Sequence, residues 1–315
     1  MRNVEINPFT VAMIGLIPGN YHPYSWSAII NGYDRAVMAS CPTAIIPGYL
    51  DRQPDGSVRI PFARVTHVWT DRPEDAPHIA AAALIPHVVA RPEDVIGAVD
   101  AVIIATDDGD DHVGRARPFV EAGLPVFVDK PLATNVADLR QFCRWRQAGA
   151  RIVSSSGLRY APELAQLRNL PWRWITGATC CSWKRYGIHV LEPVFTVIGS
   201  GFESVRAVER AGTEVLELEH RSGVVVSLAA IEAGFGSAFV LHGYGDQLHR
   251  CVELRDVYAA FRAQLLGFLE YASGRGPEPH PFAETTELMA ALIAGRRSRA
   301  EQGRRVPLAE IFGEI

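Results

Sequence analysis

The sequence is poor in cysteine, and it contains no long apolar run. Its five cysteines are odd in number and none stands in a C-x-x-C spacing, which argues against a disulfide framework or a zinc site and favours a reducing compartment. No apolar stretch approaches the roughly 20 residues of a membrane span. The first residues, MRNVEINPFTVAMIGL, do not have the pattern of a signal peptide. We therefore expect a cytoplasmic protein that contacts no membrane and binds no metal.

A basic block is also lacking, since the net charge is −4 and both signs are interspersed. This argues against nucleic acid as a partner. The arginines at 296, 297, 299, 304 and 305 are interpreted as a solvated helix face. The 315 residues suit two domains, and the apolar fraction of 48% is that of an ordinary globular protein.

The first half of the chain alternates short apolar runs with amphipathic stretches, which is the pattern of βαβ units and a parallel sheet. The expected strands are 9–16, 64–70, 100–106, 125–128 and 151–155. The expected helices are 24–31, 74–84, 92–97, 112–122 and 135–149, with Asn135 as an N-cap. Residues 33–63 have no sustained period and are interpreted as an insertion.

After residue 160 the pattern changes to runs that follow one another with short turns, which is typical of an antiparallel sheet. The expected strands are 175–183, 204–210, 214–220, 224–231, 238–244 and 247–254, and the expected helices are 188–198, 257–273 and 284–302. The pattern therefore predicts an α/β domain with a parallel sheet, followed by a domain with a mostly antiparallel sheet.

A turn rich in glycine follows the first strand and contains Gly15, Ile17, Gly19 and Asn20. Backbone N–H groups in such a turn can bind a pyrophosphate at the start of a helix. The copy is irregular, because Ile17 stands where G-x-G-x-x-G has its second glycine, and a plain tight loop is the alternative.

Asp71 ends the second strand, where a carboxylate can bind the adenosine ribose and repel a 2′-phosphate. That favours NAD, although Arg72 beside it is suited to the phosphate of NADP. The interval from the glycine turn exceeds the usual ~20 residues, and the insertion accounts for the difference. An ordinary exposed turn aspartate is the alternative.

Asp129-Lys130-Pro131 lies at the carboxyl end of a buried strand, where open α/β sheets bind their ligands. A lysine there can hold a substrate hydroxyl and change its proton affinity. Without its neighbours, Lys130 is better interpreted as a surface lysine before a helix.

The run from Asp100 to Leu139, with DKPLA at 129–133, resembles the glucose–fructose oxidoreductase/inositol dehydrogenase family (Gfo/Idh/MocA). A second hallmark of that family, G-x-H-x-x-D, is similar to GIHVLE at 187–192, with Glu192 for the final aspartate. The end of the chain, AETTELMAALIAGRRSRAEQGRRVPL, resembles the family's last helix and tail. The resemblance covers both halves of the chain. It implies an α/β Rossmann domain with a parallel sheet, followed by an α+β domain with a large, mostly antiparallel open sheet. We therefore predict a dinucleotide-binding domain over 1–132 and a substrate and oligomerisation domain over 133–315.

The resemblance implies hydride transfer between a nicotinamide cofactor and a secondary alcohol of a sugar or cyclic polyol. The expected cofactor is NAD, with NADP as the alternative. It implies that Lys130 orients the substrate and that His189 is the general base, for which an imidazole is suited. Further cofactor contacts are implied at Thr106, Asp107, His112, Asp129 and Lys130, and substrate contacts at Arg159, Tyr160, Lys184, Arg185, Tyr186 and His189. Trp26, Trp183 and Tyr186 are either sugar-stacking or core aromatics.

One departure from the family concerns the position four residues before His189, where an aspartate is usual and Arg185 stands. A cation there lowers the pKa of the histidine. Because an unpaired guanidinium in a dry cleft is costly, we expect Arg185 to meet a carboxylate, with Asp107, Asp108 and Asp110 as candidates and an acidic substrate as the alternative. Glu192 is too far along the helix for direct pairing.

Two other functions are compatible with the sequence. Some relatives use tightly held NAD to cleave glycosidic bonds, and the same fold can serve as a non-catalytic nucleotide-binding sensor. The open face of the second sheet, with apolar strands such as 224–231, predicts a homodimer or homotetramer.

Overall fold

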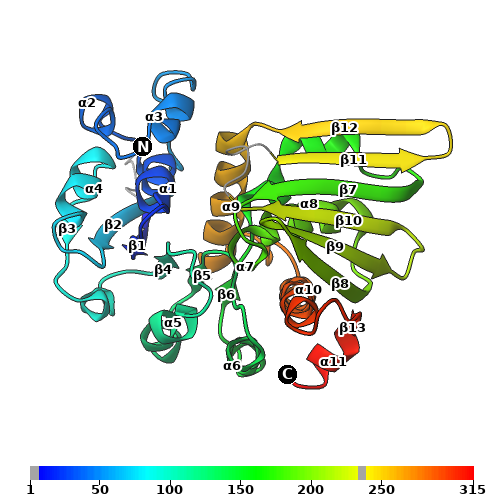
Figure 1. The fold of residues 1–315 in the computed structure, drawn as a ribbon. Coiled ribbons are helices and arrows are strands. Elements are labelled where there is room, and N and C mark those ends of the chain that lie inside the picture. Colours follow the sequence, from blue (N-terminus) through cyan, green and yellow to red (C-terminus); the bar gives the residue numbers. More distant parts are fainter. Residues whose placement is uncertain (1–6, 233–238) are drawn as a thin grey trace.

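The computed structural model describes residues 7–232 and 239–315, which form two β-sheets with helices around them. The first sheet belongs to the N-terminal half of the chain and the second to the C-terminal half (Figure 1). Helix α9 (Val257–Ala272) stands between the two sheets and packs on α1 (His22–Asn31) of the first half. The prediction of an α/β domain followed by an α+β domain is confirmed.

The first sheet has six parallel strands in the order β3-β2-β1-β4-β5-β6. Their bounds are β1 Phe9–Ile14, β2 Ala63–Trp69, β3 His87–Val88, β4 Ala101–Ile104, β5 Val126–Val128 and β6 Ile152–Val153. The order reverses between β1 and β4, and at such a switch point the carboxyl ends of the strands border a ligand crevice. The predicted glycine turn and Lys130 both lie at this edge.

Short helices connect these strands: α2 Arg35–Met38, α3 Ile45–Leu50, α4 Ala76–Ala82, the 3₁₀ turn η1 Pro92–Val95, α5 His112–Glu121 and α6 Val136–Gln147. Asn135 caps α6 as expected, because its side chain accepts from the Asp138 N–H. Residues 33–63 were predicted to lack a sustained period, and they contain α2 and α3, which are too short to show one. The strand β3 was not predicted either, because its two residues are too few to show a period.

The second sheet has seven strands in the order β12-β11-β7-β10-β9-β8-β13. Their bounds are β7 Trp172–Cys180, β8 Phe202–Arg210, β9 Thr213–His220, β10 Val225–Ile231, β11 Phe239–Gly245, β12 Leu248–Leu254 and β13 Val306–Pro307. The pair β7–β10 is parallel, and the other pairs are antiparallel. Residue 238, placed in a strand by the sequence, lies outside the described residues.

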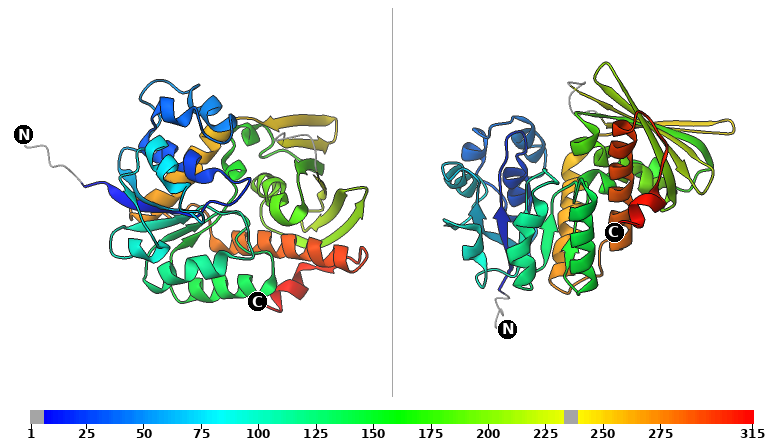
Figure 2. Two further views of the ribbon diagram at one scale, coloured as in Figure 1. Left: turned by 60° about the vertical axis from the view of Figure 1, so that its left-hand side comes forward. Right: turned by 60° about the horizontal axis from the view of Figure 1, so that its bottom comes forward.

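The remaining helices are α7 Trp183–Tyr186, α8 Ile188–Ile198, α10 Phe282–Ala300 and α11 Leu308–Phe312, with 3₁₀ turns η2 Gly157–Tyr160 and η3 Pro162–Gln166. Helices α8 and α10 pack on one face of the second sheet, and α10 also contacts α6 of the first half (Figure 2). Strand β7 ends at Cys180, so Trp183 starts a helix instead of ending a strand as predicted. None of the described helices is long and apolar enough to span a membrane.

The basic run near the C-terminus does not form the purely solvated face that its spacing indicated. Arg297 pairs with Glu314, Arg299 with Glu209, and Arg305 with Glu217. These ion pairs attach the end of α10 to the last residues and to the second sheet. The division of the chain after residue 132 stays a prediction, and β6 belongs to the first sheet although it follows that position.

Candidate active site

The glycine turn lies against the end of β4. Gly15 has φ +97°, and a Cβ there would lie 2.5 Å from Thr106 Cγ2, so the turn requires glycine. The backbone N–H groups of Ile17 and Gly19 donate no hydrogen bond to any of the described residues. Helix α1 begins just beyond, at His22. Free N–H groups before a helix N-terminus suit the pyrophosphate of a dinucleotide.

Asp71 lies beside this turn, as predicted. Its carboxylate accepts the Leu16 N–H at 3.0 Å and pairs with Arg115 at 2.7 Å. Arg72, the predicted alternative partner for a 2′-phosphate, instead pairs with Asp75. The cation beside Asp71 is therefore Arg115 of α5, which sequence reasoning missed because 44 residues separate the two.

The loop after β4 contains two more predicted cofactor residues. The Thr106 hydroxyl oxygen is buried and has no partner in the described part of the chain. Both ring nitrogens of His112 are within hydrogen-bond distance of carbonyl oxygens, those of Thr106 at 2.7 Å and Leu132 at 3.2 Å. The histidine thus holds the loop to the DKPLA segment. The unpartnered Thr106 oxygen and the free N–H groups of the turn fit a dinucleotide at this edge.

Asp129 ties the glycine turn to the end of β5. Its buried carboxylate accepts from the Asn20 side-chain amide at 2.9 Å and lies 2.6 Å from His22 Nδ1. His22 was missed by the sequence analysis, although its place at the start of the helix after the glycine turn is a usable signal. The His22 ring stacks on Trp26, with centroids 4.2 Å apart. Trp26 is fully buried, so it is a core residue and does not stack on a sugar.

Asp107, Lys130 and Arg185 form a cluster of charges at the crevice, which we call the first charge cluster. Lys130 Nζ lies 3.3 Å from Asp107, and Arg185 binds the same carboxylate with two hydrogen bonds of 2.8 Å. Burial alone would raise the pKa of Asp107, but the two cations outweigh it and hold that pKa well below its usual range. The expectation that Arg185 meets a carboxylate of the 107–110 loop is confirmed, and Lys184 pairs with Asp110 of the same loop.

His189 lies next to this cluster. Its Nδ1 is 2.7 Å from the Ser156 hydroxyl, and its ring centroid is 5.0 Å from that of Tyr186. Lys130 Nζ lies 4.6 Å from the centre of the same tyrosine ring. Burial, and next the charge of Lys130, hold the pKa of His189 well below its usual value. The lowered pKa was predicted, but its expected cause, Arg185, is neutralised by Asp107.

Arg159, Glu192 and Glu284 form a second charge cluster on the other side of His189. Glu192 accepts the Ser156 N–H at 3.1 Å and pairs with Arg159 at 3.1 Å, and Arg159 also pairs with Glu284. Burial raises the pKa of Glu192. As expected, Glu192 does not reach Arg185. Ser156, which joins Glu192 to His189, had no signal in the sequence.

Arg159 and Tyr160 are predicted substrate residues that the structure does not bring to His189. They border a separate hollow together with Phe195 and Glu284. The Tyr160 hydroxyl lies 3.2 Å from His280 Nδ1. Trp183, offered as a sugar-stacking or core residue, is fully buried and donates to the Leu292 carbonyl, so it belongs to the core.

A cavity of about 580 Å³ opens beside His189. His22, Tyr186 and His189 line it, together with residues of α3 and α9. The described lining is completed by Gly19, Tyr21, Ser25, Thr43, Gly157, Leu158, Cys180, Cys181 and Phe239. The predicted base therefore borders a space large enough for a small molecule.

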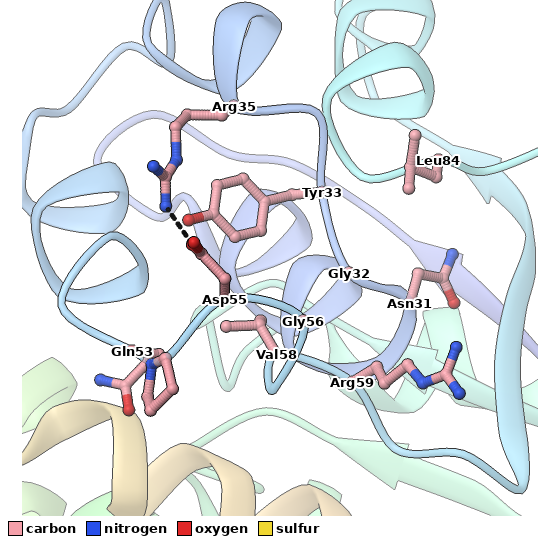
Figure 3. Close-up of a pocket in the computed structure, with 11 residues that line it drawn as sticks. Asn31, Gly32, Tyr33, Arg35, Gln53, Asp55, Gly56, Val58, Arg59 and Leu84 are labelled. Carbon is pink, nitrogen blue, oxygen red and sulfur yellow. Dashed lines mark hydrogen bonds and ion pairs between the residues drawn. The ribbon is translucent and has the colours of Figure 1, made fainter.

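A second cavity, of about 350 Å³, lies on the outside of the first domain. Figure 3 shows Tyr33, Arg35 and Asp55 close together at its edge, and Arg35 pairs with Asp55 at 3.4 Å. None of the predicted site residues lines this cavity. It holds no constellation of catalytic groups, and the chemistry is assigned to the first cavity.

The fold and the site define a class: a nucleotide-binding Rossmann domain with a buried lysine at the edge of its sheet and a histidine that borders a small-molecule cavity. Residues 9–155 match the model of the family GFO_IDH_MocA, described as "Oxidoreductase family, NAD-binding Rossmann fold". The N-terminal domain therefore belongs to this oxidoreductase family. The predictions of the family, of an oxidoreductase and of NAD as the cofactor are confirmed.

Solved structures with similar folds cover nearly the whole chain. The myo-inositol 2-dehydrogenase from Lactobacillus plantarum is 13% identical, covers 95% of this chain and 99% of its own, and has a TM-score of 0.73. The UDP-N-acetylglucosamine 3-dehydrogenase from Acidithiobacillus ferrooxidans is 16% identical over 94% and 99%, with a TM-score of 0.70. GenD2 from gentamicin A biosynthesis, in complex with NAD, is 14% identical over 96% and 97%, with a TM-score of 0.72. A search of curated proteins by sequence finds no match.

Proposed function

We propose that this protein is a dehydrogenase that transfers a hydride between NAD and a secondary alcohol of a sugar or cyclic polyol. The observation that carries the proposal is the meeting of Lys130, Tyr186 and His189 beside the glycine turn. Two of the similar structures are named as dehydrogenases of myo-inositol and of UDP-N-acetylglucosamine, and these names support the substrate class.

Bound NAD supplies the hydride acceptor, and the residues of the chain bind, orient and deprotonate the alcohol. Gly15, Ile17 and Gly19 provide the turn for the pyrophosphate, and Asp71 lies where the ribose binds. Arg115 beside Asp71 reduces its repulsion of a 2′-phosphate, so NADP is a possible second cofactor.

Lys130 holds the substrate hydroxyl and stabilises the alkoxide that forms as the hydride leaves. Its ammonium is paired with Asp107, but that carboxylate also neutralises Arg185. The first charge cluster thus has one positive charge in excess, next to the site where negative charge develops.

His189 accepts the hydroxyl proton. The lowered pKa keeps its imidazole neutral at physiological pH, as a base must be. The Ser156 hydroxyl can donate to Nδ1 or accept from it, so it supports either neutral tautomer and leaves Nε2 for the substrate.

The test is formation of NADH from NAD with a panel of inositols and sugars, followed by product analysis. An oxidised product with an equal amount of NADH is expected from the wild-type protein. Free sugar released from a glycoside without net NADH would instead indicate the NAD-using glycosidase. Binding of NAD with no turnover of any alcohol or glycoside would indicate the non-catalytic sensor.

We also propose a cytoplasmic homodimer or homotetramer formed through the open face of the second sheet. Trp174, Val208, Val215 and Val225 are between 40% and 48% exposed on its strands, and such apolar groups favour a protein partner. Strand β10 is less apolar on this face than its sequence indicates, because Val226, Leu228 and Ala230 are buried on the opposite face. A monomeric mass by light scattering at micromolar concentration would refute this assembly.

A further inference from the structure

We propose that the cavity between α3 and α9 binds an apolar substituent of the substrate. The oxidised compound is then a sugar or polyol that carries an aryl or branched alkyl group, and not a bare polyol. The assignment of a sugar or polyol as the hydroxylated part of the substrate rests on the proposed function. The apolar part rests on the walls of the cavity alone.

Two helices contribute apolar walls to the cavity. Helix α3 contributes Ile45 and Ile46, and α9 contributes Val257, Ala260 and Phe261. Ile45 is 62% exposed, an unusual state for a large aliphatic side chain that lines a cavity. A ligand with an apolar group would remove this surface from water, and that burial stabilises the complex.

Tyr49 is the polar side chain among the residues that α3 and α9 contribute to this lining, and its hydroxyl bonds to the Ser25 hydroxyl. The Nδ1 atoms of His22 and His189 are engaged by Asp129 and Ser156. A bare polyol carries a hydroxyl on each ring carbon, and those that lie against α3 and α9 would lose water without gaining a side-chain partner there.

The groups suited to chemistry come from other elements than the apolar groups. His22 begins α1, and Tyr186 and His189 come from α7 and α8, whereas α3 and α9 supply the aliphatic and aromatic groups. This division matches a molecule with one hydroxylated end and one apolar end. It also gives a role to residues 33–63, which separate the glycine turn from Asp71 and supply α3.

The first experiment is calorimetric titration of the wild-type protein, in the presence of NADH, with two matched pairs of ligands. One pair is cyclohexanol and myo-inositol, and the other is phenyl and methyl β-D-glucopyranoside. We expect the more apolar member of each pair to bind about tenfold tighter or better. Equal or tighter binding of myo-inositol and methyl glucoside, or no binding of the apolar members, would overturn the assignment.

The second experiment compares Ile45→Asn with Leu84→Asn. Leu84 is 47% exposed and lines the outer cavity of Figure 3, so it is a control of the same chemistry at a site the substrate does not reach. We expect Ile45→Asn to weaken the apolar ligands by about fivefold and to leave NADH binding unchanged, with no effect of Leu84→Asn. Weaker NADH binding in Ile45→Asn, or an unchanged preference for the apolar ligands, would overturn the assignment.

These outcomes separate the inference from the proposed function. Binding of the apolar ligands without any reduction of NAD would retain the cavity assignment and remove the dehydrogenase. Reduction of NAD by unsubstituted polyols, with no gain from a phenyl group, would do the reverse.

Discussion

The two charge clusters on either side of His189 have opposite imbalances. The first has two cations, Lys130 and Arg185, around the carboxylate of Asp107. The second has two carboxylates, Glu192 and Glu284, around the guanidinium of Arg159. The first borders the glycine turn, because the Arg185 guanidinium lies near Gly19, and the second includes Arg159 of η2.

The opposite charge imbalances indicate that the two clusters have different roles. An excess positive charge beside the crevice is useful for a dinucleotide and for a developing alkoxide. The second cluster fixes Ser156, which in turn fixes His189. Breaking the first cluster should therefore affect turnover, and breaking the second should affect stability and the position of the base.

The largest effect is expected for Lys130→Met. Loss of the ammonium should lower kcat by about 10²- to 10⁴-fold, because the alkoxide loses its stabilising charge. Asp107 keeps its two hydrogen bonds to Arg185, so the melting temperature should change little. Steady-state kinetics and thermal melts measure both. A variant that retains turnover would remove Lys130 from the mechanism.

Glu192→Leu tests the second cluster. Arg159 would keep only the partly exposed Glu284, and the buried Ser156 N–H would lose its acceptor, at a cost of about 3 kcal/mol of unfolding free energy. Urea unfolding measures the loss. Glu284→Gln is the matched control on the same arginine and should cost under about 1 kcal/mol. Equal losses in both variants would contradict the role given to Glu192.

The positioning role of Glu192 has a separate readout. Glu192→Asp keeps the carboxylate type, and it should recover most of the stability while lowering kcat more than it changes KM. An unchanged kcat in Glu192→Asp, with His189 ordered as in the wild-type protein, would contradict the link through Ser156.

Each cluster also lowers the pKa of a histidine, which predicts a pH dependence of stability. Burial and Arg159 lower the pKa of His280 to about 3, and burial and Lys130 lower that of His189. Above pH 6.5 both histidines are neutral in the folded and unfolded states, so their contribution to stability is full. As the pH falls below this value, the two histidines bind protons in the unfolded chain but stay neutral in the folded one. The free energy of unfolding therefore decreases.

The expected loss between pH 7 and pH 5 is about 2 kcal/mol for His280, and His189 contributes a loss of the same sign. His280→Gln should reduce the slope by its own share, and the exposed His249→Gln should leave it unchanged. Urea midpoints across this range measure the slope. A stability that rises on acidification would contradict the assignment of neutral buried histidines.

The smallest effect concerns the choice of cofactor. Arg115→Ala leaves Asp71 without its cation, so rejection of a 2′-phosphate should strengthen and the preference for NAD over NADP should rise about fivefold. The kcat/KM values for the two cofactors give this ratio. Arg72→Ala is the control, because Arg72 pairs with Asp75. A change in the cofactor preference of Arg72→Ala alone would instead support the predicted interaction of Arg72 with the 2′-phosphate of NADP.

The fold could be predicted in large part because its signals are local. Apolar runs, the cap at Asn135 and the family motifs place β4, β5 and α6 with small errors at their ends. The helices and strands missed include β3, β13, α2, α3, α7 and α11, which have two to six residues and no period to detect.

The site was less accessible to sequence reasoning, because its contacts join distant residues. The motifs indicate Lys130 and His189, and the charge argument predicts the pairing of Arg185 with the 107–110 loop. The pair His22–Asp129 is separated by 107 residues, and Ser156–His189 by 33. No local pattern reports such contacts, and none shows that α3 lines the cavity.

Transfer of deuterium tests the central claim most directly. A ring alcohol that the enzyme oxidises is labelled with deuterium at the reacting carbon and incubated with NAD, and the nicotinamide is then analysed by mass spectrometry. The account predicts deuterium at the nicotinamide ring with the wild-type protein and little or none with Lys130→Met. Oxidation of the alcohol with no deuterium in the nicotinamide would contradict hydride transfer at this site.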